Sequence, residues 1–103
     1  RKFEPLLVTI DPRNNEEIRP VTHGGQEFNM VLSGIVRVFL GGKDIDLYPG
    51  DSIFFDPTIP HGQLAMSSES ASFLTVIMHD LPGAPAIPAT PSAAESGREG
   101  SLC

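Results

Sequence analysis

The sequence predicts an all-β fold that closes into one small barrel. Between residues 23 and 61, apolar segments of strand length follow one another along the chain. The turn signals LSG, LGGKD and YPGD separate them, and each contains a glycine where a turn needs positive φ or a close approach of the backbone. Helical periodicity is absent throughout. Short strands alternating with glycine turns are typical of an all-β meander.

Length and composition limit the chain to one domain, since it has 103 residues of which 40% are hydrophobic. The net charge is −6 and no block of Lys or Arg is present, so we expect no contact with nucleic acid. The single cysteine, Cys103, excludes an internal disulfide and indicates a cytoplasmic protein. No apolar run approaches the roughly 18 residues of a membrane span, so no membrane association is expected.

The first predicted strand covers residues 3–10 and ends at the turn-forming pair Asp11-Pro12, because proline fixes φ and keeps the preceding residue out of the helical region. Pro5 lacks a backbone N–H, which favours an edge position for this strand. The polar stretch 13–22 that follows is predicted to be an irregular loop.

From Glu27 the sequence has a period of two, which predicts a strand that ends where Gly34 reverses the chain. One face carries Glu27, Asn29, Val31 and Ser33, and the other carries Phe28, Met30 and Leu32. Residues 35–40 are apolar on both faces apart from Arg37, which predicts a strand covered on both sides. Residues 44–48 alternate polar and apolar, which indicates a half-exposed strand.

The later strands are predicted at 52–55, 62–66 and 71–78, and the rigid segment DPTIP leads into His61. We expect the barrel domain to cover residues 1–80. Residues 81–103 are rich in Pro, Ala, Ser and Gly and are expected to form a flexible tail.

Large apolar side chains are expected to fill the barrel, since a small barrel needs a packed interior. The candidates for the core or for a pocket wall are Phe28, Met30, Phe39, Phe54, Phe55, Leu64 and Phe73. Aromatic residues on the opposite face are candidates for a homodimer interface.

Two short motifs resemble those of the cupin superfamily, in particular the small single-domain cupins of the cupin-2 type. His23, Glu27 and Gly34 have the spacing of the first cupin motif, and Gly50 and His61 fit the second. The resemblance covers roughly residues 20–78 and implies a double-stranded β-helix, or jelly-roll barrel. Val21 and Ala65 depart from it, because the family usually has His and Asn at these places.

The segments EPLLVTIDP, HGGQEFNMVLSG, GDSIFFDPTIPHG and FLTVIM look like the C-terminal cupin domain of helix-turn-helix transcriptional regulators. This resemblance implies an effector-binding domain that senses a small molecule, with the DNA-binding part outside this chain. It also implies a homodimer, which the fold commonly forms.

A metal site would use His23, Glu27 and His61, because two His and one carboxylate suit Fe(II), Mn(II), Ni(II) or Zn(II). Residues four apart on an unbroken strand share a face, so His23 and Glu27 can both point inward. The pair Gly24-Gly25 favours a bend that would interrupt this alternation.

The alternative is a metal-free pocket for a polar small-molecule ligand. In that pocket Gln26, Asn29 and Gln63 would bind the ligand together with His23 and His61. Glu27 would then pair with Arg37 or Arg19 on the rim.

Three functions fit these features, in order of preference. The first is a small-molecule sensor belonging to a transcriptional regulator, for which no residue is assigned a catalytic role. The second is a small metal-dependent cupin enzyme of the dioxygenase, isomerase or decarboxylase type. The third is a structural barrel that binds no small ligand.

Overall fold

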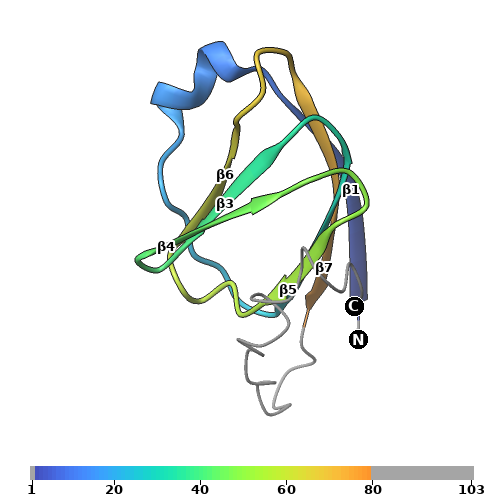
Figure 1. Ribbon diagram of the computed structural model, residues 1–103. Helices are drawn as coiled ribbons and strands as arrows, with labels where there is room; N and C mark the ends of the chain where they lie inside the picture. Colours follow the sequence, from blue (N-terminus) through green and yellow to red (C-terminus); the bar gives the residue numbers. More distant parts are fainter. Residues whose placement is uncertain (1, 80–103) are drawn as a thin grey trace.

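The computed structural model describes residues 2–79, so the predicted tail at 81–103 lies outside the described residues. The described part contains seven β-strands and one short 3-10 helix (Figure 1). Their bounds are β1 Lys2–Ile10, η1 Pro12–Glu17, β2 Gln26–Ser33, β3 Val36–Leu40, β4 Lys43–Leu47, β5 Ser52–Phe55, β6 His61–Ala65 and β7 Ala71–His79. Within residues 2–79, no helix has the length and apolar character needed to cross a membrane.

The strands form two antiparallel sheets, one in the order β1-β7-β2-β5 and the other in the order β4-β3-β6. The all-β prediction is confirmed, but the meander connectivity is wrong. In the described part, β3 and β4 are the one consecutive pair that is hydrogen-bonded. Turn glycines reveal that the chain reverses, but they do not reveal which sheet the next strand joins. After Gly34, with φ at 74°, the chain leaves the first sheet and β3 starts the second.

Strand β1 lies at the edge of its sheet, as Pro5 predicts, and pairs with β7 along its whole length (Figure 1). The register runs from Lys2 opposite His79 to Ile10 opposite Ala71. The first and last described strands are therefore neighbours, and their pairing joins the two ends of the described chain.

The predicted loop at 13–22 is wrong at its start, where residues 12–17 form the 3-10 helix η1. Asp11 caps this helix by accepting the Arg13 backbone N–H at 2.9 Å, and Pro12 occupies its first turn. Asn15 projects from η1 to the edge of β6, where its Nδ2 donates to the Ala65 carbonyl at 2.7 Å. Its Oδ1 accepts the Ala65 N–H at 3.1 Å. A helix this short has no apolar stripe, so periodicity does not reveal it.

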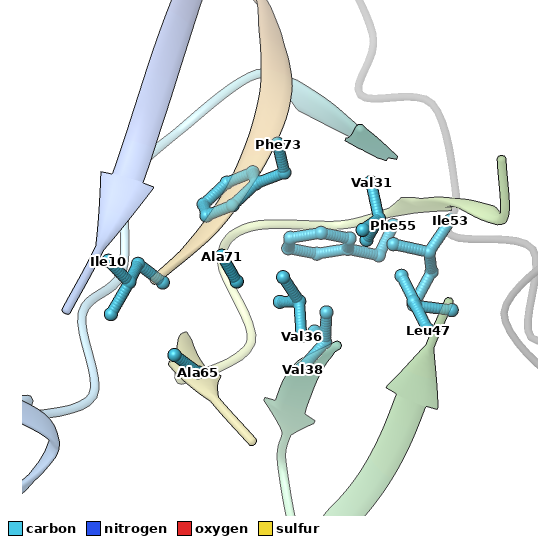
Figure 2. Packing of buried hydrophobic residues seen from close by; sticks show 10 residues of the cluster. All are labelled: Ile10, Val31, Val36, Val38, Leu47, Ile53, Phe55, Ala65, Ala71 and Phe73. Carbon is cyan, nitrogen blue, oxygen red and sulfur yellow. The ribbon is translucent and has the colours of Figure 1, made fainter. Parts of the chain in front are cut away.

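The hydrophobic core lies between the two sheets (Figure 2). It consists of Ile10, Val31, Val36, Val38, Leu47, Ile53, Phe55, Ala65, Ala71 and Phe73. The prediction is confirmed for Phe55 and Phe73, which are buried. It is wrong for the other five candidates, which are half-buried: Phe28, Met30, Phe39, Phe54 and Leu64.

The error has one physical cause, because alternation alone does not state which face of a strand turns inward. In β2 the inward face carries Glu27, Asn29 and Val31, so Phe28 and Met30 point outward. In β3 only one face is fully covered, since Val36 and Val38 are buried and Phe39 is half-buried, which corrects the expectation of cover on both sides.

The outward face of the four-stranded sheet is rich in apolar side chains. The register aligns them in rows that cross the sheet, such as Pro5, Val76, Phe28 and Phe54. We name this surface the outer apolar face; it comprises Phe3, Pro5, Leu7, Phe28, Met30, Phe54, Leu74, Val76 and Met78. Phe3 and Leu7 are 60% and 70% exposed, so this face presents large apolar groups to solvent.

Candidate metal centre

His23, Glu27 and His61 meet inside one end of the barrel. Their ligand atoms all lie within 4.8 Å of one another. Glu27 Oε1 is 2.9 Å from His23 Nε2 and 3.2 Å from His61 Nε2. The structure therefore brings together the three residues that the sequence proposes as metal ligands.

His23 reaches this cluster from a loop, because β2 starts only at Gln26. The expectation of an unbroken strand from His23 to Glu27 is therefore wrong. Gly25 bends the chain with φ at 86°, and a Cβ at this position would overlap the carbonyl oxygen of Met78. Beyond this bend the backbone N–H of His23 bonds to the carbonyl of Pro57, and the side chain of His23 still faces Glu27.

The turn at residues 56–60 supports both histidines. The carbonyl of Pro57 accepts the backbone N–H of His23 at 3.0 Å. The carbonyl of Ile59 accepts a hydrogen bond from His61 Nδ1 at 2.8 Å. Asp56 stabilises the turn, since its Oδ1 accepts the Thr58 backbone N–H at 2.9 Å. This proline-rich turn therefore delivers His61 and also fixes the loop that carries His23.

The hydrogen bonds at Nδ1 determine the tautomer of each imidazole. His61 Nδ1 donates to Ile59, and His23 Nδ1 lies 3.0 Å from the carbonyl oxygen of Gly24. A carbonyl oxygen only accepts, so Nδ1 carries the proton in both rings. In the neutral ring the Nε2 lone pair then points into the cluster. Metal-binding histidines usually show this arrangement, with the remote N–H held by a backbone carbonyl or carboxylate.

Glu27 is deeply buried, with its side chain 5% exposed beside His61 at 2%. Burial by itself would raise the pKa of Glu27, but hydrogen bonds from His61, Asn29 and His23 outweigh this and lower the pKa below its ordinary value. For His61 burial acts to lower the pKa, and the hydrogen bonds to Glu27 and Ile59 reverse the direction and raise it. The cluster thus stabilises a carboxylate charge inside the barrel.

The predicted pairing of Glu27 with an arginine on the rim is wrong. Arg37 pairs with Asp46 at 2.7 Å on the neighbouring strand. Arg19 donates to the carbonyl of Glu16 at 2.6 Å. The inward direction of Glu27 in β2 explains both results, because the arginines lie outside the barrel interior.

The second carboxylate oxygen, Glu27 Oε2, faces two amide groups. Asn29 Nδ2 donates to it at 2.9 Å and Gln63 Nε2 at 3.2 Å. Thr75 accepts a further hydrogen bond from Asn29 Nδ2 at 2.7 Å. Thr75 is not among the residues predicted from the sequence. The signal that could have identified it is a polar residue in a strand, β7, whose neighbouring residues are apolar.

Gln26 is buried but is not brought to the cluster. Alternation along β2 places its side chain on the face opposite Glu27 and Asn29, and its partner on β7 is Met78. Of the predicted ligand-binding set, the structure therefore gathers His23, His61, Asn29 and Gln63. Their role in binding a small molecule stays a prediction.

The cluster fits a divalent transition metal by its donor chemistry. Two imidazole nitrogens and one carboxylate oxygen suit Fe(II), Mn(II), Ni(II) or Zn(II). Ligands about 2.1 Å from one metal ion lie roughly 3 Å from their neighbours, close to the 2.9 and 3.2 Å seen between Glu27 Oε1 and the two Nε2 atoms. The His23 side chain is 32% exposed, so the cluster is accessible to solvent on the side of His23.

Solved structures resemble this chain over most of its length. Hydroxypropylphosphonic acid epoxidase from S. wedmorenis has 28% identity and a TM-score of 0.66, over 74% of this chain and 43% of that chain. An Fe(II) HppE in complex with substrate has 29% identity and a TM-score of 0.66, over 74% of this chain and 45% of that one. This chain thus spans less than half the length of these two proteins.

A third structure is the cupin domain of an XRE-family transcriptional regulator from Enterobacter cloacae. It has 23% identity and a TM-score of 0.67, over 78% of this chain and 84% of that chain, and it shows the shared fold. No curated protein sequence matches the chain.

The cupin domain family matches residues 6–77. This range contains β2 to β6, most of β7, both motifs and all three residues of the cluster. The two antiparallel sheets agree with the structures above. The chain therefore belongs to the cupin family.

Proposed function

We propose that this cupin domain binds a divalent transition metal through His23, Glu27 and His61, and that a small molecule binds beside it. One observation carries the proposal, namely that two Nε2 atoms and one carboxylate oxygen lie within 4.8 Å of one another. The hydrogen bonds of Nδ1 to the carbonyls of Gly24 and Ile59 support it, because they leave Nε2 of each ring as the atom that can bind a metal once its proton, directed at Glu27, is lost.

The two histidines have different surroundings in this site. His61 is held from behind by Ile59 and from the side by Phe55, whose ring centroid is 5.0 Å away. The His23 ring meets the His61 ring edge to face at 5.1 Å, on the solvent side. A metal held by three protein ligands has open positions that bind and polarise an oxygen-donor ligand.

The sensing function is the one we propose for this site: the domain would bind an effector for a transcriptional regulator in the cytoplasm. The sequence segments that resemble helix-turn-helix regulators support it, and the structure of the Enterobacter cloacae regulator domain has the same fold. Effector binding needs only the open side of the cluster next to His23.

The elemental content of the purified chain tests the metal proposal. Plasma mass spectrometry should find near-stoichiometric Fe, Mn, Ni or Zn in the native chain, and should find it lost in His23→Ala and in His61→Ala. Arg37→Ala is a matched control, because it removes a charged side chain bound to Asp46 outside the cluster. A native chain that stays folded, binds no added metal and equals its variants would overturn the proposal.

A metal-dependent enzyme is the second candidate. The similarity to Fe(II) HppE favours it, since that protein holds iron and shares 29% identity with this chain. Turnover of small oxygenated acids by the iron-loaded chain, lost in His61→Ala, would support the enzyme. Thermal stabilisation by metabolites without any turnover would support the sensor.

We also propose that the chain forms a homodimer through the outer apolar face. Large apolar side chains as exposed as Phe3 and Leu7 are unusual on a monomer, and they lie on one continuous sheet surface. Pro5 interrupts the row of N–H groups on β1, which favours contact through the face of the sheet over pairing along its edge.

A further inference from the structure

We propose that Asn29 and Gln63 are positioning residues for the metal ligand Glu27. They would hold Oε2 away from the metal, so that the carboxylate offers Oε1 alone. This inference rests on the proposed metal site and adds how the coordination mode of the carboxylate is set.

The two oxygens of Glu27 have separate surroundings. Oε1 faces the imidazoles, at 2.9 Å from His23 Nε2 and 3.2 Å from His61 Nε2. Oε2 accepts hydrogen bonds from Asn29 Nδ2 at 2.9 Å and from Gln63 Nε2 at 3.2 Å. The carboxylate plane is thus fixed by donors on both of its oxygens.

Each amide divides its two N–H groups between Glu27 and another acceptor. Asn29 Nδ2 also donates to Thr75 Oγ1 at 2.7 Å. Gln63 Nε2 also donates to Asn29 Oδ1 at 2.8 Å. Both amide nitrogens have therefore used their donors, and neither can move to a new partner without leaving a buried acceptor unsatisfied.

The network crosses the barrel interior. Asn29 lies on β2 and Thr75 on β7 of one sheet, while Gln63 lies on β6 of the other sheet. Asn29 is 1% exposed, so water does not compete for its hydrogen bonds. An amide pair anchored on both sheets resists rotation of the Glu27 carboxylate better than a single donor on a flexible loop would.

Removal of one donor should free Oε2. A buried carboxylate oxygen that has lost a donor can recover interaction energy by turning toward the metal and binding with both oxygens. The expected consequences are a changed coordination number and a changed affinity. A residue that only supported the fold would alter neither quantity in the protein that stays folded.

The test uses the full chain and Co(II), whose visible absorption reports coordination number. Gln63→Met removes the donors with little change in length. We expect this variant to bind Co(II) about 10- to 100-fold more weakly in competition with a chelator, which is the usual effect of losing a residue that orients a metal ligand. We also expect its visible spectrum to differ from that of the native chain.

Two controls separate positioning from stability. Leu64→Ala changes the neighbouring residue on β6, which points away from Glu27, and should lower thermal stability with affinity and spectrum unchanged. Thr75→Val should give a smaller shift in affinity through Asn29, whereas Thr75→Ser keeps the hydroxyl and should restore the native values.

The outcomes are distinct. Native Co(II) binding with a shifted Gln63→Met spectrum supports both the metal site and the positioning role. If the native chain binds Co(II) and the folded Gln63→Met variant binds it with the same affinity and spectrum, the positioning role is overturned and the metal site stands. No Co(II) or Zn(II) binding by the native chain overturns the metal site, and the positioning role falls with it.

Discussion

The two ends of the barrel interior are built from the same strands but contain opposite chemistry. Along the inward face of β2, Glu27 and Asn29 are followed by Val31, and along β7 Thr75 is followed in the other direction by Phe73. One end is the apolar core of Figure 2, and the other is a cluster of buried polar groups. Burial alone therefore does not distinguish structural from functional positions in this fold.

The apolar end of the interior stabilises the fold, whereas the polar end lowers its stability unless its buried groups are hydrogen-bonded. Apolar side chains in the core contribute roughly 1.5–3 kcal/mol each when fully buried. A buried carboxylate must be compensated by hydrogen bonds, and Glu27 has four such contacts, with His23, His61, Asn29 and Gln63. The interior thus combines an apolar core at one end with a buried charge at the other, where we propose that the metal binds.

The largest effect on stability is expected at the apolar end. Phe73→Ala should lower the free energy of unfolding by about 3–5 kcal/mol, because it opens a cavity between the sheets. The fraction that stays folded should bind metal with native affinity. Urea unfolding and metal titration of the same sample check both statements. Phe39→Ala, at a half-buried position outside the core, should lower the free energy of unfolding clearly less than Phe73→Ala. An equal decrease would show that the core is misassigned.

The second-largest effect on stability is expected at Gly25, in the bend before β2. Gly25→Ala should cost about 1–3 kcal/mol, because φ is 86° and a methyl group would overlap the Met78 carbonyl. It should also weaken metal binding by displacing His23. Gly24→Ala is the matched control, since a Cβ added there would meet no atom within 4 Å and its φ is not positive. Equal behaviour of the two variants would contradict the role of the bend.

The stability of the metal-free chain should depend on pH through the polar end of the barrel interior, because the residues of the apolar core have no titrating group. Without metal, the raised pKa of His61 adds stability that is complete below its ordinary value of 6.5 and is lost as pH rises through the folded pKa. The lowered pKa of Glu27 adds stability that is complete above its ordinary value of 4.5 and is lost as pH falls through the folded pKa. This pair therefore stabilises the metal-free chain most between these two values.

Metal binding should show the opposite slope on the alkaline side. The Nε2 atoms must be unprotonated to bind, so affinity should increase as pH rises through the raised pKa of His61. Thermal unfolding with a chelator and with Zn(II), from about pH 5 to about pH 8, measures both trends. His61→Ala should flatten the metal-free trend, and an unaltered slope in this variant would assign the effect to another group.

The smallest effect on folding is expected on the outer apolar face. Leu7→Asp should convert a dimer to a monomer, because it places a charge among apolar groups on the exposed side of β1. The free energy of unfolding of the monomer should change by only about 0.5 kcal/mol. Sedimentation velocity measures the association state. Met66→Asp, at a residue 41% exposed and outside this face, should leave the association state unchanged. A native chain that is monomeric at every concentration would refute the interface.

Much of this architecture can be predicted from the sequence, because the residues that define each strand and turn lie close together along the chain. The turn glycines and apolar runs predict all seven strands within a few residues. The resemblance to the cupin motifs points to His23, Glu27 and His61, which the structure brings together although His23 reaches the cluster from a loop. The family match over residues 6–77 confirms the resemblance to cupins.

The parts that could not be predicted depend on contacts between distant segments. Thr75 joins the polar network through Asn29, 46 residues away in the sequence, and no local pattern encodes that pairing. The inward direction of Glu27 in place of Phe28 depends on which sheet β2 joins. The path of His23 depends on Pro57 and Met78, which approach Gly25 and its neighbours only in the folded barrel.

The contact of Asn15 with β6 has a consequence for the behaviour of the protein in concentrated solution. Its amide offers Ala65 one acceptor and one donor, as a neighbouring strand would. The free margin of a sheet is a template on which other chains can grow into aggregates. Asn15 covers this margin at Ala65, while the backbone of Val21 covers it at His61. Loss of the Asn15 side chain should therefore appear first as reduced solubility, while metal binding by the dispersed protein stays intact.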